Sequence, residues 1–95
     1  MPQSRPALII NTDSLGKLPL KIIAPITDWK DNYENYPWMI KITPTKQNCL
    51  SKISAVDCFQ IRSVSIERFI DFIGSVESEI IAHSQEAITK IIGTL

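Results

Sequence analysis

The chain has 95 residues, of which 10 are Lys or Arg and 10 are Asp or Glu, so its formal net charge is zero. Apolar residues make up 44% of the chain, which excludes a disordered polymer, and the length suits one domain or slightly less. Residues 1–56 carry seven basic and four acidic side chains, whereas residues 57–95 carry three basic and six acidic ones. A chain divided in this way can present a basic face at zero net charge.

The sequence also argues against a membrane or secreted protein. No apolar run is long enough to cross a bilayer, and residues 1–5 lack the apolar stretch of a secretory signal. The two cysteines, Cys49 and Cys58, fit neither a disulfide framework nor a zinc spacing. We therefore expect free thiols, a cytoplasmic protein and no membrane partner.

Short strands are predicted along most of the chain. Residues 7–11 form an apolar run typical of a buried strand, and residues 20–26 form a second strand whose Pro25 indicates an edge position or a strand end. Further strands are predicted over 38–42, 53–62 and 69–73. Alternation over 53–62 predicts that Gln60 and Arg62 point to the same side.

The clearest helix is predicted over residues 76–92, where Val76, Ile80, Ala87 and Ile91 share one apolar stripe with Ile81, Ile88 and Ile92 beside it. Ser75 is a plausible N-cap and Gly93 a C-terminal stop. Short strands followed by one terminal helix predict a mainly β fold with some α, a small barrel-like domain with a helix packed on it. No repeat or linker divides residues 1–95, which we expect to form a single domain.

The residue types alone suggest little chemistry. No cluster of side chains has metal-ligand spacing, and the single histidine, His83, lies at the margin of the helix stripe. No Ser or Cys sits in a nucleophile motif, and the three glycines are too far apart for a phosphate-binding loop. What remains is a set of polar residues at strand ends: Arg5, Thr27, Gln60, Arg62 and Ser63.

The order of three short motifs resembles the MazF/PemK family of toxin endoribonucleases from type II bacterial toxin–antitoxin systems. The motifs are Arg5-Pro6 with the apolar run after it, Ala24-Pro25-Ile26-Thr27, and Gln60-Ile61-Arg62-Ser63-Val64. Smaller pieces are similar as well: Tyr36-Pro37-Trp38, Asn48, Leu50 and Ile73-Gly74. The resemblance runs from Arg5 to the C-terminus and implies a small SH3-like or PemK-like β-barrel with a C-terminal α-helix.

The resemblance implies an mRNA interferase, a cytoplasmic nuclease that cleaves single-stranded mRNA at selected sequences by attack of the RNA 2′-hydroxyl, with no metal or other cofactor. The family's catalytic pair falls on Arg5, which would stabilise phosphate charge, and on Thr27, which would orient the scissile phosphate. The RNA-binding residues implied or inferred beside them are Asn11, Trp29, Lys30, Gln60, Arg62 and Ser63. For Trp38 we favour packing at the strand entry over RNA binding.

The chain departs from the family pattern at three places. Only four residues precede Arg5, where the family usually has a further strand and loop, so we expect the first family strand and loop to be missing. Cys49 stands where a glycine is common, and a positive φ there would strain it by roughly 1 kcal/mol. Phe59 replaces a frequent acidic residue, which leaves Asp57 as a weak candidate for the base.

The resemblance also implies partners. We expect a homodimer and a cognate antitoxin whose acidic, partly disordered segment covers the RNA groove, with operator DNA bound only through the toxin–antitoxin complex. Two alternatives stay open at this stage. One is a catalytically inactive antitoxin-binding module of the same fold, and the other is a CcdB-like gyrase poison.

Overall fold

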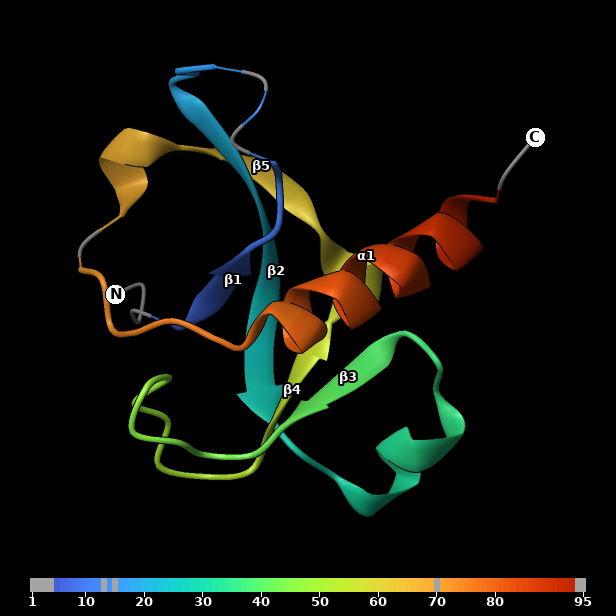
Figure 1. Cartoon of the computed structure of the whole chain (residues 1–95). Coiled ribbons are helices and arrows are strands. Elements are labelled where there is room, and N and C mark those ends of the chain that lie inside the picture. The colour runs from blue at the N-terminus through green and yellow to red at the C-terminus, as the bar shows by residue number, and fades with distance from the viewer. Residues whose placement is uncertain (1–4, 13, 15, 70, 94–95) are drawn as a thin grey trace.

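A computed structural model describes residues 5–12, 14, 16–69 and 71–93. Within these residues the strands form an antiparallel sheet in the order β1-β2-β4-β3, and β5 also pairs with β2. The helix α1 (Ser78–Ile92) crosses one face of the sheet (Figure 1). The sheet is barrel-like but not closed, and the expectation of a mainly β fold with a C-terminal helix is confirmed. The strand bounds are β1 Ala7–Ile9, β2 Leu20–Asp28, β3 Met39–Ile42, β4 Ser54–Asp57 and β5 Arg62–Ser65.

The edge strand β1 is shorter and less buried than the sequence predicted. Leu8 is buried, whereas Ala7 and Ile9 are exposed, because among the described strands β1 pairs with β2 alone and buries one face. The expected strand to residue 11 ends early. The Asn11 side-chain oxygen accepts the N–H of Ile22 at 2.9 Å and so takes the place of a backbone partner.

The prediction of one continuous strand over residues 53–62 is wrong. The chain forms β4, then a single 3-10 turn η3 over Cys58–Gln60, and then β5. Both strands lie along β2, with Ile26 opposite Val56 and Ile23 opposite Arg62, so η3 takes up the extra residues between them. All four residues of β4 are buried, since β4 is an inner strand between β2 and β3, and the predicted alternation of burial is absent there.

Pro25 lies inside β2 and not at its end, which corrects the expectation of an edge or terminal position. Its place follows from the break between β4 and β5. The ladder of β2 with β5 ends at Ile23, and the ladder with β4 begins at Ile26. A residue without an N–H is tolerated at a gap of this kind, because no hydrogen bond of the sheet is lost.

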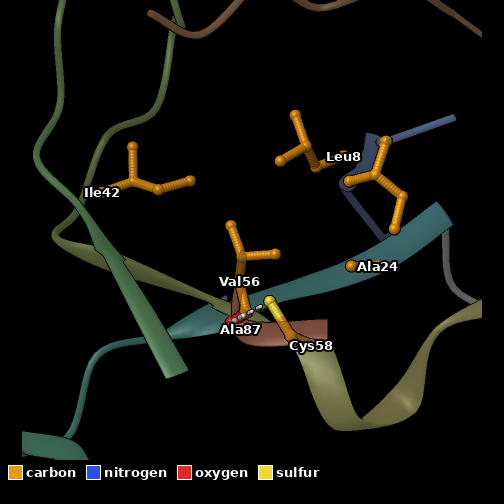
Figure 2. Packing of buried hydrophobic residues seen from close by; sticks show 7 residues of the cluster. Leu8, Ala24, Ile42, Val56, Cys58 and Ala87 are labelled. Atoms are coloured by element: carbon orange, nitrogen blue, oxygen red, sulfur yellow. Dashed lines mark hydrogen bonds between the residues drawn. The ribbon is translucent and has the colours of Figure 1, made fainter. Parts of the chain in front are cut away.

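The core lies between the sheet and α1, which spans Ser78–Ile92. Figure 2 shows Leu8 and Ala24 from β1 and β2, Ile42 and Val56 from β3 and β4, and Ala87 from the helix converging on one cluster. The helix stripe packs against this cluster as predicted, apart from Ile92, which is 74% exposed. No helix in the described ranges has the length and apolar character needed to cross a membrane.

The segment that leads into α1 differs from its prediction. Residues 66–68 form a 3-10 turn, η4 (Ile66–Arg68), and the described residues of the predicted strand 69–73 are irregular, while Ile70 lies outside the described residues. The helix begins at Ser78 with Glu77 at the N-cap position, so Ser75 is not the cap. Instead Ser75 ties this segment to the β3–β4 loop, because its N–H donates to the Gln47 carbonyl at 2.9 Å and its hydroxyl accepts from the Gln47 side chain at 3.0 Å.

Cys49, in the loop between β3 and β4, has a φ of 55°, so the condition under which a cysteine at this position is strained is met. An L-residue pays roughly 1 kcal/mol in this region, whereas glycine does not. We therefore expect Cys49→Gly to stabilise the protein by about 0.5–1 kcal/mol, the gain being reduced by the greater freedom of glycine in the unfolded chain. A higher urea midpoint for Cys49→Gly than for Cys49→Ala, which keeps the strain, checks this; equal midpoints would contradict it.

Candidate active site

The hydrogen bond between Ile26 and Pro6 brings the next residues, Thr27 and Arg5, to the same end of the β1–β2 ladder. Ala7 lies opposite Pro25, and the next pair outward is held by the N–H of Ile26, which donates to the Pro6 carbonyl at 3.0 Å. Extending the register by one residue beyond Pro6 would set Arg5 opposite Thr27 in a non-hydrogen-bonded pair, the kind in which facing side chains lie closest.

Both residues lie on the face of the sheet that α1 leaves uncovered. Ala24 and Ile26 point into the core under the helix, so the alternation of a strand turns Pro25 and Thr27 to the opposite face. Arg5 and Thr27 are exposed, and neither side chain forms a hydrogen bond or ion pair with another described residue. A guanidinium and a hydroxyl side by side on an exposed face can both bind one phosphate group.

The same row of the sheet continues across two more strands. Thr27 lies opposite Ala55 of β4, and Ala55 lies opposite Lys41 of β3. Ala55 is fully buried, whereas Lys41 is exposed. The row therefore runs Arg5, Thr27, Ala55, Lys41, with one cation at each end. Sequence reasoning did not select Lys41, although its place between apolar residues of a predicted strand was a signal that it faces away from the core.

The structure separates the residues of the third motif. Gln60 belongs to η3 and not to a strand, and its side chain donates to the Asp57 carboxylate at 2.7 Å. Arg62 pairs with Ile23, on the same face as Thr27 but about 13 Å further along β2, at four residue rises. Ser63 pairs with Ile22, a residue packed against the core, so it belongs to the opposite face. The expectation that Gln60 and Arg62 project together from one strand is wrong.

Asp57 serves the backbone of this turn. Its carboxylate accepts the N–H of Phe59 at 3.1 Å and the Gln60 side chain at 2.7 Å, and the residue is 9% exposed. These contacts cap η3, in the way that an aspartate commonly holds a turn. The carboxylate is thus engaged in holding the turn that separates β4 from β5, which speaks against Asp57 as a base.

The other predicted RNA-binding residues differ in exposure: Asn11 and Trp29 are half-buried, and Lys30 is exposed. The Asn11 side-chain oxygen accepts the backbone N–H of Ile22, so this residue has a structural role. Trp29 is half-buried beyond the end of β2; its ring meets Tyr33 edge-to-face at 5.7 Å between centroids, and the Lys41 ammonium lies 5.1 Å from the centroid of its indole ring. Lys30 is exposed just before η2, the 3-10 helix Asp31–Asn35.

The aromatic residues from Trp29 to Phe59 form one chain of ring contacts. Tyr36 stacks on Trp38 with centroids 4.9 Å apart, and Trp38 meets Phe59 at 5.6 Å. Trp38 also packs against the core cluster, so the expectation of packing for this side chain is confirmed. Phe59 is 62% exposed.

The remaining reactive side chains lie elsewhere. Cys58 is buried, and burial raises the pKa of its thiol, opposed by a hydrogen bond from Ser84. A neutral, buried thiol is a poor nucleophile. His83 is exposed on α1, on the covered side of the sheet. Among the described residues, no three His, Cys, Asp or Glu side chains lie close enough together to hold a metal ion.

A family model settles which group of proteins the chain belongs to. Residues 1–92 match the model described as PemK-like, MazF-like toxin of type II toxin–antitoxin system. The chain belongs to this family. The resemblance seen in the three motifs is thereby confirmed. Whether a strand is missing before Arg5 concerns residues 1–4, which lie outside the described residues.

Solved MazF structures share the fold of this PemK-like, MazF-like chain. The Mycobacterium tuberculosis toxin MazF-mt6 is 21% identical to it with a TM-score of 0.75, over 93% of this chain and 85% of that one. A chain in a MazE–MazF structure from Deinococcus radiodurans is 17% identical with a TM-score of 0.72, over 95% of this chain and 85% of that one. Comparison with curated protein sequences gives no match.

Proposed function

We propose that the chain is an endoribonuclease toxin that cleaves single-stranded mRNA at selected sequences without a metal ion. The observation that supports this most strongly is that the Ile26–Pro6 hydrogen bond brings Arg5 and Thr27, both exposed, to the same end of β1 and β2. These two residues are the ones on which the resemblance to MazF and PemK toxins puts the catalytic pair. Family membership supports the toxin role, and the substrate and reaction are our proposal.

In the proposed reaction the 2′-oxygen of the RNA attacks the neighbouring phosphorus, so the P–O2′ bond forms as the P–O5′ bond breaks. The 2′-hydroxyl loses one proton and the leaving 5′-oxygen gains one, which yields a cyclic phosphate and a 5′-hydroxyl. Negative charge gathers on the phosphoryl oxygens in the transition state, and groups aimed at those oxygens lower the barrier.

The two side chains divide this work. Arginine stays protonated at any pH of interest, so Arg5 acts as a fixed cation whose donor fork matches two phosphoryl oxygens. The Thr27 hydroxyl donates one hydrogen bond and fixes the orientation of the phosphate, which aligns the 2′-oxygen with the leaving oxygen. The exposed Arg62, further along the same face, would contact the RNA backbone away from the reacting bond.

We further propose that a cognate antitoxin inhibits the chain and that two copies of the chain form the active dimer. An acidic, partly disordered antitoxin segment suits the face that carries Arg5, because carboxylates are attracted by the same cations as phosphates. The MazE–MazF structures from Deinococcus radiodurans support a toxin–antitoxin pair as the relevant assembly. Operator DNA would then be bound mainly through the antitoxin.

The test uses the purified chain with a long unstructured RNA in EDTA. We expect discrete fragments whose 5′ ends accept a label from polynucleotide kinase without prior phosphatase treatment, because they carry 5′-hydroxyls. Intact RNA together with tight antitoxin binding would overturn the enzyme assignment and indicate an inactive binding module. DNA breaks that require gyrase would indicate a gyrase poison instead.

A further inference from the structure

The row of residues that contains Arg5 and Thr27 ends in a cation of its own on β3. We propose that Lys41 contacts the substrate, its ammonium binding an RNA phosphate next to the scissile one. The proposal rests on the endoribonuclease function proposed above. It assigns a third phosphate-binding residue to the site and sets the direction in which the RNA crosses the sheet.

The first argument is position. Lys41 lies opposite Ala55, and Ala55 lies opposite Thr27, so all three side chains belong to one face of the sheet. With strands about 4.8 Å apart, Lys41 is about 10 Å from Thr27 at the backbone, and Arg5 lies beyond Thr27 on the β1 side. An RNA backbone laid along this row meets Arg5 and Thr27 at one phosphate and Lys41 beyond them.

The second argument is that the Trp29 ring positions the Lys41 ammonium, while no carboxylate among the described residues forms an ion pair with it. It lies 5.1 Å from the centroid of the Trp29 ring, and Trp29 is two residues beyond Thr27, on the same face. The ring holds the cation near Thr27 while leaving its three N–H donors available. The lysine–carboxylate pairs found among the described residues are Lys52 with Asp28 and Lys90 with Glu86, and Lys41 takes part in neither.

The third argument is that the neighbouring carboxylates do not compete for this cation. Asp28 is paired with Ser54 in the sheet, one step from Thr27, and so lies on the other face, where its carboxylate is 3.9 Å from Lys52. Asp57 lies on the same face as Lys41 but is engaged by Phe59 and Gln60. A cation on an exposed face without a local carboxylate partner is suited to an anionic ligand.

The test compares Lys41→Gln with the wild type in cleavage of a short single-stranded RNA at several KCl concentrations. We expect KM to rise roughly tenfold with kcat within about twofold, as for a lost charge-assisted hydrogen bond to the bound substrate. The slope of log KM against log salt should shrink by about 0.7, the value for one phosphate contact to a single strand. Lys41→Arg should keep most of the affinity, because it keeps the charge.

Lys90→Gln is the matched control, since Lys90 lies on α1, on the covered side of the sheet, and it should leave KM and the salt slope unchanged. A wild-type KM and slope for Lys41→Gln would overturn the assignment of Lys41 while leaving the endoribonuclease function intact. A wild type that cleaves no RNA would instead defeat the proposed function. In that case the Lys41 assignment is tested by the binding of a 2′-deoxy oligonucleotide. Equal affinities and equal salt slopes for the wild type and Lys41→Gln would overturn the assignment.

Discussion

Replacing Arg5 by alanine is expected to lower kcat/KM for RNA cleavage by about 10²–10³-fold, the usual effect of removing one group that stabilises transition-state charge. Arg5 is exposed and precedes β1, so its loss should change the free energy of unfolding by less than about 0.5 kcal/mol. Single-turnover cleavage rates together with urea unfolding measure the two quantities separately. A large loss of rate at unchanged stability is the expected combination.

Variants at the same pair sharpen this result. Arg5→Lys keeps a charge but loses the donor fork, so it should recover part of the rate. Thr27→Val removes a hydroxyl at nearly constant shape, and the double variant with Arg5→Ala should be less impaired than the product of the single losses, because both side chains bind one phosphate. Arg68→Ala, which changes an exposed arginine in η4, is the control. Strict multiplicativity of the two effects would contradict a shared phosphate.

The placement of Arg5 near Thr27 shows how much of the candidate site can be predicted from the sequence. The apolar runs predicted both strands, and the resemblance to MazF and PemK toxins named the two residues as a pair. Their proximity depends on the register between β1 and β2, which residues 10–19 connect. A connection of that length does not set a register as a tight turn does. Register is decided instead by which residues the core accepts, Leu8 and Ala24 here.

Gln60 shows where a pattern of apolar alternation fails. The run over 53–62 continues through Cys58, Phe59 and Ile61, and nothing in its period marks a break. The break arises because the Asp57 side chain accepts the Phe59 N–H and turns the chain, a local competition between side chain and strand ladder. An aspartate followed three residues later by a glutamine was the available signal. Lys41 was missed for a different reason, since its place in the row requires the registers of three strands.

Replacing Asn48 is expected to lower the stability of the protein strongly. It is buried in the loop between β3 and β4, where its side-chain oxygen accepts the N–H groups of Thr45 at 2.9 Å and Leu50 at 3.0 Å, and its amide donates to the Thr43 carbonyl at 3.0 Å. Asn48→Ala leaves these three backbone groups without partners in a partly buried loop. A loss of about 2–4 kcal/mol follows, at roughly 1 kcal/mol or more for each unsatisfied group.

The measurement is the free energy of unfolding in urea, with thermal unfolding beside it. For a domain of this size, each kcal/mol corresponds to roughly 4–8 °C in Tm, so Asn48→Ala should melt at least about 8 °C below the wild type. Asn48→Asp keeps both accepted bonds and loses the donated one, so it should fall between the two. Gln47→Ala removes one exposed side-chain hydrogen bond to Ser75 and is the neighbouring control, expected to cost under about 1 kcal/mol. A destabilisation of Asn48→Ala no larger than that of Gln47→Ala would contradict the structural role of the Asn48 hydrogen bonds in this loop.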